Sequence, residues 1–335
     1  MLKEMKKICY LAAALLIASC QHDVVSEVDY NITLASDNTY YAGDPVRFNI
    51  DGDVDNLLFY SGETGAQYIY KDRFVVDAAD IKSAKLTLEI MGAYGELGCL
   101  EVWVSNTFAG LTGTDGAADK QTIQDMVDGG MQEWTQIPYS DVKANEAKWT
   151  TIEFSLNDYL ENMSIAFHWC PRDPTKTQRR YYIKGFVDVE MEGAPTVSQT
   201  LRDFSMVKIM MNDEEVTLHN PENKSGNGTM RVPQPNKDTG LYTEEQHIIM
   251  QSIGGGLLKY ALDGWVISTP KPLNNVANDK GVVIKNLQNY LHSYEYTWDT
   301  PGTYTVTFVG RNENYASSSE MVKEMTITIL EKPVE

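Results

Sequence analysis

Short runs of alternating or β-branched residues, separated by turn-forming residues, are the feature that most restricts what this chain can fold into. In the run 302–310 (GTYTVTFVG), Tyr304, Val306 and Phe308 fall on one face of an extended strand, because successive side chains point to opposite sides. Gly, Asn, Asp and Pro punctuate the runs, as is typical of strand ends and turns. Comparable runs occupy residues 45–50, 56–60, 85–91, 99–105, 149–156, 163–169, 181–191, 281–285 and 324–330. The sequence predicts an all-β protein of tandem antiparallel β-sandwiches, with short helical segments at 120–127 and within 244–252.

The first 19 residues have the order of a secretory signal peptide. Lys3, Lys6 and Lys7 form a basic start, which an uncharged apolar run over residues 8–18 follows. This run is too short for a permanent span, because a helix needs about 20 residues to cross the hydrocarbon core. We therefore expect a leader that is removed on export.

The leader ends at a cysteine that suggests a lipid anchor. The sequence Leu16-Ile17-Ala18-Ser19-Cys20 resembles a bacterial lipobox, in which the cysteine is acylated and becomes the first residue of the mature chain. The alternative is an ordinary signal peptide that ends beside a chance cysteine. We expect lipidation at Cys20, a tether over residues 20–28, and attachment to the outer membrane with exposure at the cell surface.

The charge of the mature chain restricts its partners. Removal of residues 1–19 takes away three of the 28 basic and one of the 47 acidic side chains, which leaves a net charge of about −21. Such an excess repels nucleic acid and anionic lipid headgroups. We expect no nucleic-acid partner and no cofactor, and contact with the membrane through the lipid anchor alone.

The mature chain is longer than one hydrophobic core usually serves. The clearest seam lies at residues 191–195, where a strand pattern stops at a Gly and a Pro. It predicts an N-terminal β-sandwich region over 29–192, immunoglobulin-like at its start and jelly-roll-like in its remainder, and a C-terminal domain over 196–333. The closing strands of this second domain resemble those of PKD-type immunoglobulin-like domains. A further boundary is possible at residues 72–80.

Several phrases together resemble a family of surface lipoproteins of the Bacteroidota whose defining domain has no assigned function. They are residues 56–63 with Tyr68 and Arg73, then 100–106, 263–268 and 281–285. The resemblance implies a role beside Sus-type outer-membrane importers, as an accessory glycan-binding protein in the SusE or SusF position. The importer and its lid lipoprotein would then be partners. No binding residue is carried over from the family.

Motifs of catalysis are not found in this sequence. It has no G-x-S-x-G elbow, no H-E-x-x-H, no P-loop and no dinucleotide fingerprint. Carboxylates are so numerous that a glycosidase pair can arise in the fold, since two acids need only lie about 5–9.5 Å apart. The favoured reading is a protein that is not an enzyme.

Metal and disulfide candidates are weak. Asp51, Asp53 and Asp55 repeat the first half of a calcium loop, but its second half fails, so a solvated turn is preferred. His168 and Cys170 share one face of a strand, and two ligands fall short of a zinc site. A core histidine beside a core thiol is the better interpretation. Cys99 and Cys170 form a disulfide if their strands are neighbours, and otherwise remain free thiols.

Sugar binding requires exposed aromatic rings beside amides and carboxylates. We expect Trp103, Trp265 and Trp298 to be core residues. The candidates for ligand contact lie in polar surroundings, Trp134 and Trp149 in separate segments and the others in a basic loop over 169–182. The loop candidates are Trp169, Arg179, Tyr181 and Tyr182.

The resulting hypothesis is a non-catalytic, surface-exposed glycan-binding lipoprotein. Two alternatives stay open. The same architecture can capture peptides or proteins for an importer, and the basic loop suits an acidic ligand. Less favoured is a glycoside hydrolase whose acids are placed by the fold.

Overall fold

A computed structural model describes residues 25–36, 39–142, 147–173, 175–212, 229–232, 239, 247–251 and 261–333. The expected signal peptide, Cys20 and the first part of the tether lie outside these residues. Within the described part of the chain, no helix is both long and apolar enough to span a bilayer.

The chain forms two compact units, and strands dominate both. Unit 1 combines residues 1–74 with residues 277–335, and unit 2 is the intervening segment 75–276. The strands pair antiparallel throughout, except for one short parallel contact in unit 1. The expected all-β sandwich class is confirmed.

Unit 1 consists of two sheets with an aromatic core. The first sheet has the order β1 (Asp29–Leu34), β3 (Pro45–Asp53), β17 (Ser293–Thr297). The second has the order β16 (Val282–Lys285), β4 (Asn56–Tyr60), β18 (Gly302–Glu313), β19 (Ser318–Leu330), β2 (Tyr40–Tyr41). The ring centroids of Phe48 and Phe308 lie 5.2 Å apart, and Trp298 is fully buried beside them. The predicted inward face of β18 is confirmed, since Val306 and Phe308 are buried and Tyr304 packs against the core.

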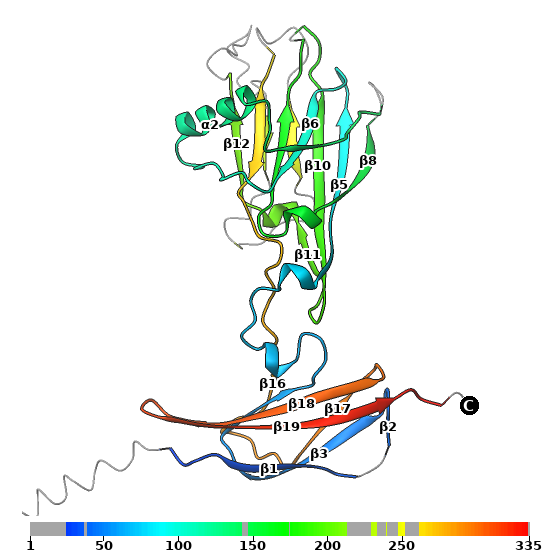
Figure 1. Cartoon of the computed structure of the whole chain (residues 1–335), viewed down its shortest axis with the longest axis vertical. Helices are drawn as coiled ribbons and strands as arrows, with labels where there is room; N and C mark the ends of the chain where they lie inside the picture. Colours follow the sequence, from blue (N-terminus) through cyan, green and yellow to red (C-terminus); the bar gives the residue numbers. More distant parts are fainter. Residues whose placement is uncertain are drawn as a thin grey trace, which may run out of the picture. The chain divides into compact units, whose positions relative to one another are not determined.

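Unit 2 is a larger β-sandwich (Figure 1). One sheet has the order β13 (Thr229–Arg231), β14 (Ile248–Gln251), β10 (Arg180–Met191), β5 (Ile81–Ala93), β8 (Lys148–Ser155), and β11 (Val197–Thr200) also pairs with β10. The other has the order β12 (Met206–Met210), β15 (Gly264–Ser268), β9 (Ser164–Trp169), β6 (Leu100–Ser105), β7 (Thr135–Ile137). Leu86, Leu88, Val102, Phe167 and other apolar residues from both sheets share one buried cluster.

The α-helix of unit 2, α2 (Gly116–Asp128), lies beside β12 in Figure 1. Asp115 caps its first turn by accepting hydrogen bonds from the amides of Ala117 and Ala118 at 3.1 Å, which satisfies donors that the helix leaves free. Ile123 of α2 is fully buried and packs with Trp265 and Ile267 of β15. The helix thus covers part of the face of the five-stranded sheet that points away from the sandwich core.

Short 3-10 turns complete the elements. They span Tyr68–Tyr70 in unit 1 and Ala78–Asp80, Asn157–Tyr159 and Leu201–Asp203 in unit 2. The predicted helix at 120–127 is confirmed by α2, whereas the one expected within 244–252 is wrong for the described residues there. Ile248–Gln251 is strand β14 instead, because its backbone pairs with β10 and β13.

The expected domain division at 192–196 is corrected by the structure. Residues 192–196 form the turn of a hairpin, since β10 ends at Met191 and β11 returns along it with Val189 opposite Val197. The unit boundaries lie instead after Phe74 and after Val276. The segments expected to form an immunoglobulin-like start and a PKD-like end are therefore two parts of one unit, because β3 pairs with β17 and β4 pairs with β18.

Candidate functional site

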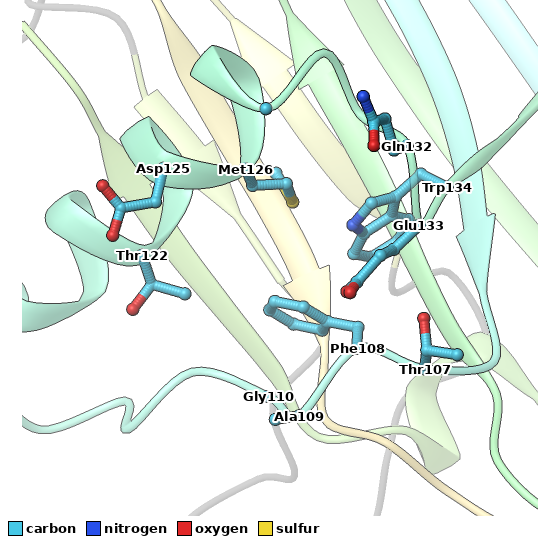
Figure 2. A pocket seen from close by; sticks show the side chains of 11 residues that line it. Thr107, Phe108, Ala109, Gly110, Thr122, Asp125, Met126, Gln132, Glu133 and Trp134 are labelled. Carbon is cyan, nitrogen blue, oxygen red and sulfur yellow. The ribbon is translucent and has the colours of Figure 1, made fainter.

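A pocket of about 510 Å³ lies between α2 and two loops of unit 2. Thr122, Asp125 and Met126 of α2 border it on one side, and Phe108 and Trp134 border it on the other, as Figure 2 shows. The segments around these residues, 107–110 after β6 and 132–134 before β7, complete the wall. The volume falls within the range of about 300–1,000 Å³ that is common for small-molecule sites. We call this cavity the Trp134 pocket.

The backbone that leads out of α2 sets the position of Trp134. The helix ends at Asp128 and Gly129 is its C-cap; Gly130 then has a φ of 71°, and Met131 has a φ of 56°, which is rare for a residue with a side chain. The amide of Met131 donates to the carbonyl of Met126 at 3.0 Å, and the amide of Trp134 donates to the carbonyl of Met131 at 3.0 Å. These two bonds turn the chain back, so that the indole packs against Phe108 with ring centroids 5.0 Å apart.

Trp134 is not the open stacking platform that its polar neighbours in the sequence suggested. Its side chain is only 6% exposed, because it packs into the apolar cluster under α2. Its indole Nε1 is buried, and no hydrogen-bond partner for it is found in the described part of the chain. Since a buried polar group without a partner is costly, a ligand or a water molecule that reached Nε1 would satisfy this donor.

The charges of the Trp134 pocket favour ligands without negative charge. Asp125 and Glu133 both contribute to its lining and are exposed, and no Lys, Arg or His is found among its described lining residues. Several groups of the pocket can form hydrogen bonds with a ligand. The carboxylates accept them, and the hydroxyls of Thr107 and Thr122 and the amide of Gln132 both accept and donate. The two apolar rings beside these groups give the mixed character that a neutral polyhydroxylated ligand requires.

A second aromatic surface lies on the outer face of the six-stranded sheet. Trp149 of β8, Met91 of β5, Tyr182 of β10 and Ile249 of β14 are neighbours in a row across four strands. Trp149 is 38% exposed, and the ammonium of Lys184 lies 4.9 Å from its ring centroid. The sheet therefore brings together two of the predicted residues, Trp149 and Tyr182, although 33 positions separate them in the sequence. We call this row the Trp149 face.

Three predicted ligand-binding residues lie in the interior, and their assignment to a surface loop is wrong. Trp169 and Tyr181 are fully buried, and Arg179 is 1% exposed. The alternation of β9 and β10 turns these rings into the sandwich, where the Trp169 indole donates to the Arg179 carbonyl at 3.1 Å. They hold structure together and are not accessible to a large ligand.

Arg179 is held by a buried ion pair. Its Nε lies 2.9 Å from Asp141 Oδ1, and its Nη2 donates to the Gly92 carbonyl at 3.0 Å. The hydroxyl of Tyr181 donates to Asp141 Oδ2 at 2.8 Å, and burial, with the charge of Asp141 second, raises the pKa of Tyr181. Arg179 is therefore neutralised in the interior and cannot contact an acidic ligand at the surface, so the structure gives less support to such a ligand.

The weak calcium candidate is not assembled. Asp51 and Asp53 are exposed in β3 opposite Asn31 and Asp29, and the Asp55 amide donates to Asn312 Oδ1 at 2.7 Å. Residues two apart on a strand are separated by about 6.6 Å. Among the described residues, their carboxylates do not form a group with metal-ligand spacing.

The possible disulfide is also not present, and both cysteines are free thiols. Their strands are neighbours, as required, and the Cys170 amide donates to the Cys99 carbonyl at 2.9 Å. The two side chains nevertheless have different partners. Cys99 Sγ donates to the Glu96 carbonyl at 3.3 Å, while the Cys170 thiol lies close to His168 and Glu101.

One polar cluster was only half visible in the sequence. Beside His168 and Cys170, the structure places Glu101 of β6 and Asp263, which precedes β15. Burial lowers the pKa of His168, but hydrogen bonds to Asp263, Cys170 and Glu101 outweigh it and raise the pKa to about 11. The spacing of His168 and Cys170 in the sequence correctly placed these two residues side by side. Glu101 and Asp263 lie 67 and 95 positions from His168, so no local pattern could predict them.

Comparison with known proteins identifies a family but no characterised relative. No curated protein and no solved structure matches the chain. A family model described as a domain of unknown function, DUF5017, matches residues 19–203, which is more than half of the sequence. This match includes α2, the Trp134 pocket, the strands β5 to β10 and every residue of the Trp149 face except Ile249. The chain therefore belongs to the DUF5017 family.

Proposed function

We propose that this protein is a non-catalytic glycan-binding lipoprotein, and that the Trp134 pocket holds a neutral sugar of the glycan. The observation that carries the proposal is the juxtaposition of two aromatic rings, a free indole donor and two carboxylates around one pocket. The small exposed part of each ring would border the sugar, while the sugar hydroxyls bond to the acids and the indole.

The charge of the chain is consistent with this ligand class. The mature protein is strongly acidic, and the acids at the pocket would repel phosphate, carboxylate or sulfate groups. The Trp149 face can contact further units of a long glycan, because Trp149 is exposed and Tyr182 is half-buried on a sheet surface. We place the protein on the outer membrane, anchored at Cys20, as an accessory to a Sus-type importer that receives the captured glycan. Weak single-site binding would be offset by many anchored copies.

Affinity electrophoresis of residues 21–335 in a panel of neutral polysaccharides tests the proposal. We expect one class of glycan to retard the protein, and Asp125→Asn or Glu133→Gln to reduce this retardation. A hydrogen bond to a charged group contributes about 1.5–3 kcal/mol, so each substitution should weaken binding by roughly 10-fold or more. Asp128→Asn is the matched control, because Asp128 lies on the same helix and is exposed but does not line the pocket.

Two further variants distinguish binding at the Trp134 pocket from binding at the Trp149 face. Trp134→Phe keeps an apolar ring in the buried cluster and removes the indole donor, and Trp149→Ala removes the exposed ring. Loss of binding in Trp134→Phe and Glu133→Gln assigns the ligand to the Trp134 pocket. Loss in Trp149→Ala alone transfers it to the Trp149 face.

Two other outcomes would replace the proposal. Release of reducing ends from the glycan by the purified protein would make it a hydrolase, with Asp125 and Glu133 as the acids to substitute first. Absence of retardation across the panel, together with binding to peptides, would identify the protein as a peptide-capturing lipoprotein.

A further inference from the structure

Glu101, His168 and Cys170 converge at one point on the outer face of the five-stranded sheet. Each offers one potential ligand atom, and these atoms all lie within 4.8 Å of one another. Nδ1 of His168 is 3.1 Å from Glu101 Oε2, since His168 and Glu101 are cross-strand partners in β9 and β6. Cys170 follows two positions after His168 on the same side of its strand.

The histidine ring is already oriented by its surroundings. Nε2 lies 2.9 Å from Asp263 Oδ1, and the amide of Asp263 in turn donates to Asn212 Oδ1 at 3.1 Å. The ring also stacks on Trp265, with centroids 3.9 Å apart and an interplanar angle of 10°. A carboxylate on the second ring nitrogen is the usual support of a histidine that binds a metal through the first.

We propose that Glu101, His168 and Cys170 form a zinc site, with Asp263 as the residue that positions His168. A thiolate, an imidazole and a carboxylate are together the ligand set that favours Zn²⁺ over Ca²⁺ or Mg²⁺. Water would fill the fourth position of a tetrahedral site. The thiol and the imidazole release their protons to solvent as the ion binds.

The dimensions and the exposure of the cluster permit this. Zinc bonds of about 2.0–2.3 Å place tetrahedral donors about 3.5 Å apart, so the present spacing closes around an ion by small side-chain rotations. The side chains of His168 and Glu101 are 17% and 32% exposed, which gives the ion access from solvent. The site is distinct from the Trp134 pocket, because none of its residues lines that pocket.

Zinc at this position would connect strands β6 and β9 and, through Asp263, the segment that enters β15. The ion would thus cross-link strands of unit 2, as a disulfide would, without involving Cys99. We expect bound zinc to raise the melting temperature of unit 2.

Cobalt substitution tests the site directly. Residues 21–335, freed of metal by a chelator, are titrated with Co²⁺ and then with Zn²⁺, and the thiolate-to-cobalt charge-transfer absorption in the near ultraviolet is recorded. We expect one equivalent of Co²⁺ to produce this band and one equivalent of Zn²⁺ to remove it. Cys170→Ser should abolish the band. Glu101→Gln should weaken metal binding but not folding, because Glu101 is partly exposed.

The second cysteine provides the matched control. Cys99→Ser should retain the band and the affinity, and Asp263→Asn should reduce zinc affinity by roughly 10- to 100-fold, as loss of such a supporting carboxylate does elsewhere. Circular dichroism confirms that each variant is folded. Absence of the band in the wild-type chain, or its persistence in Cys170→Ser, would overturn the proposal.

Discussion

The substitution Asp141→Asn should destabilise unit 2 more than any conservative change on its surface. Asp141 and Arg179 form an ion pair whose side chains are 2% and 1% exposed, and the carboxylate also accepts hydrogen bonds from Tyr139, Tyr181 and the amide of Gly98. Asparagine has nearly the same shape, so the change removes the charge without opening a cavity. It leaves the Arg179 guanidinium buried without its counter-ion.

The expected size follows from these contacts. Removal of one partner from a buried ion pair costs about 3–5 kcal/mol. Asp141→Asn should fall near the lower end of this range, because the asparagine amide keeps one oxygen that accepts a hydrogen bond. For a domain of about 200 residues, 1 kcal/mol corresponds to about 2–4 °C. We therefore expect the melting temperature of unit 2 to fall by about 6–12 °C.

Differential scanning calorimetry measures this effect, with unit 1 as an internal reference because it contains neither residue. Glu153→Gln is the matched control, since Glu153 pairs with Lys85 at 3.0 Å with side chains 62% and 46% exposed. An exposed pair contributes at most about 1 kcal/mol, so the control should melt within about 4 °C of the wild type. Equal melting temperatures for the two variants would refute the argument that Arg179 depends on its buried counter-ion.

Three further outcomes are expected. Gly310→Ala should lower the stability of unit 1 by about 1–3 kcal/mol in urea unfolding, because the added Cβ would lie 2.4 Å from Cε1 of Tyr30. Burial raises the pKa of Tyr30 to about 12, so the stability that its neutral hydroxyl provides is complete below pH 10. That stability is lost as the pH rises from about 10 to 12, and Tyr30→Phe should flatten this part of the stability profile. Burial likewise raises the pKa of the Cys99 thiol to about 12, and at pH 8 iodoacetamide should label it at least about 100-fold more slowly in the folded chain than in urea.

Local patterns predicted the elements well where the signal was also local. The alternation in residues 302–310 gave the inward face of β18, and the spacing in residues 120–127 gave α2. Trp265 and Trp298 are core residues, as expected, whereas Trp103 is only partly buried. Such assignments succeed because the period of the side chains reflects which face of an element is buried.

The candidate site was predicted less well, because exposure is a property of the assembled sheets. Polar neighbours suggested that Trp134, Arg179 and Tyr181 were accessible, yet α2 covers the first and Asp141 neutralises the second in the interior. Trp149 and Tyr182 were chosen separately and proved to lie in one row on the same sheet face, since both are cross-strand partners of Met91 in β5.

By itself, the sequence determined the all-β class and most strands, because these depend on local propensity and side-chain period. Only the tertiary structure decided that residues 25–74 and 277–333 pair into one unit while the sequence between them forms another, since strand pairing joins segments more than 200 residues apart. It also decided that Glu101 and Asp263 meet His168, and that Trp134 lines a pocket. Convergence of side chains from distant strands depends on sheet order and register, which no short stretch of sequence encodes.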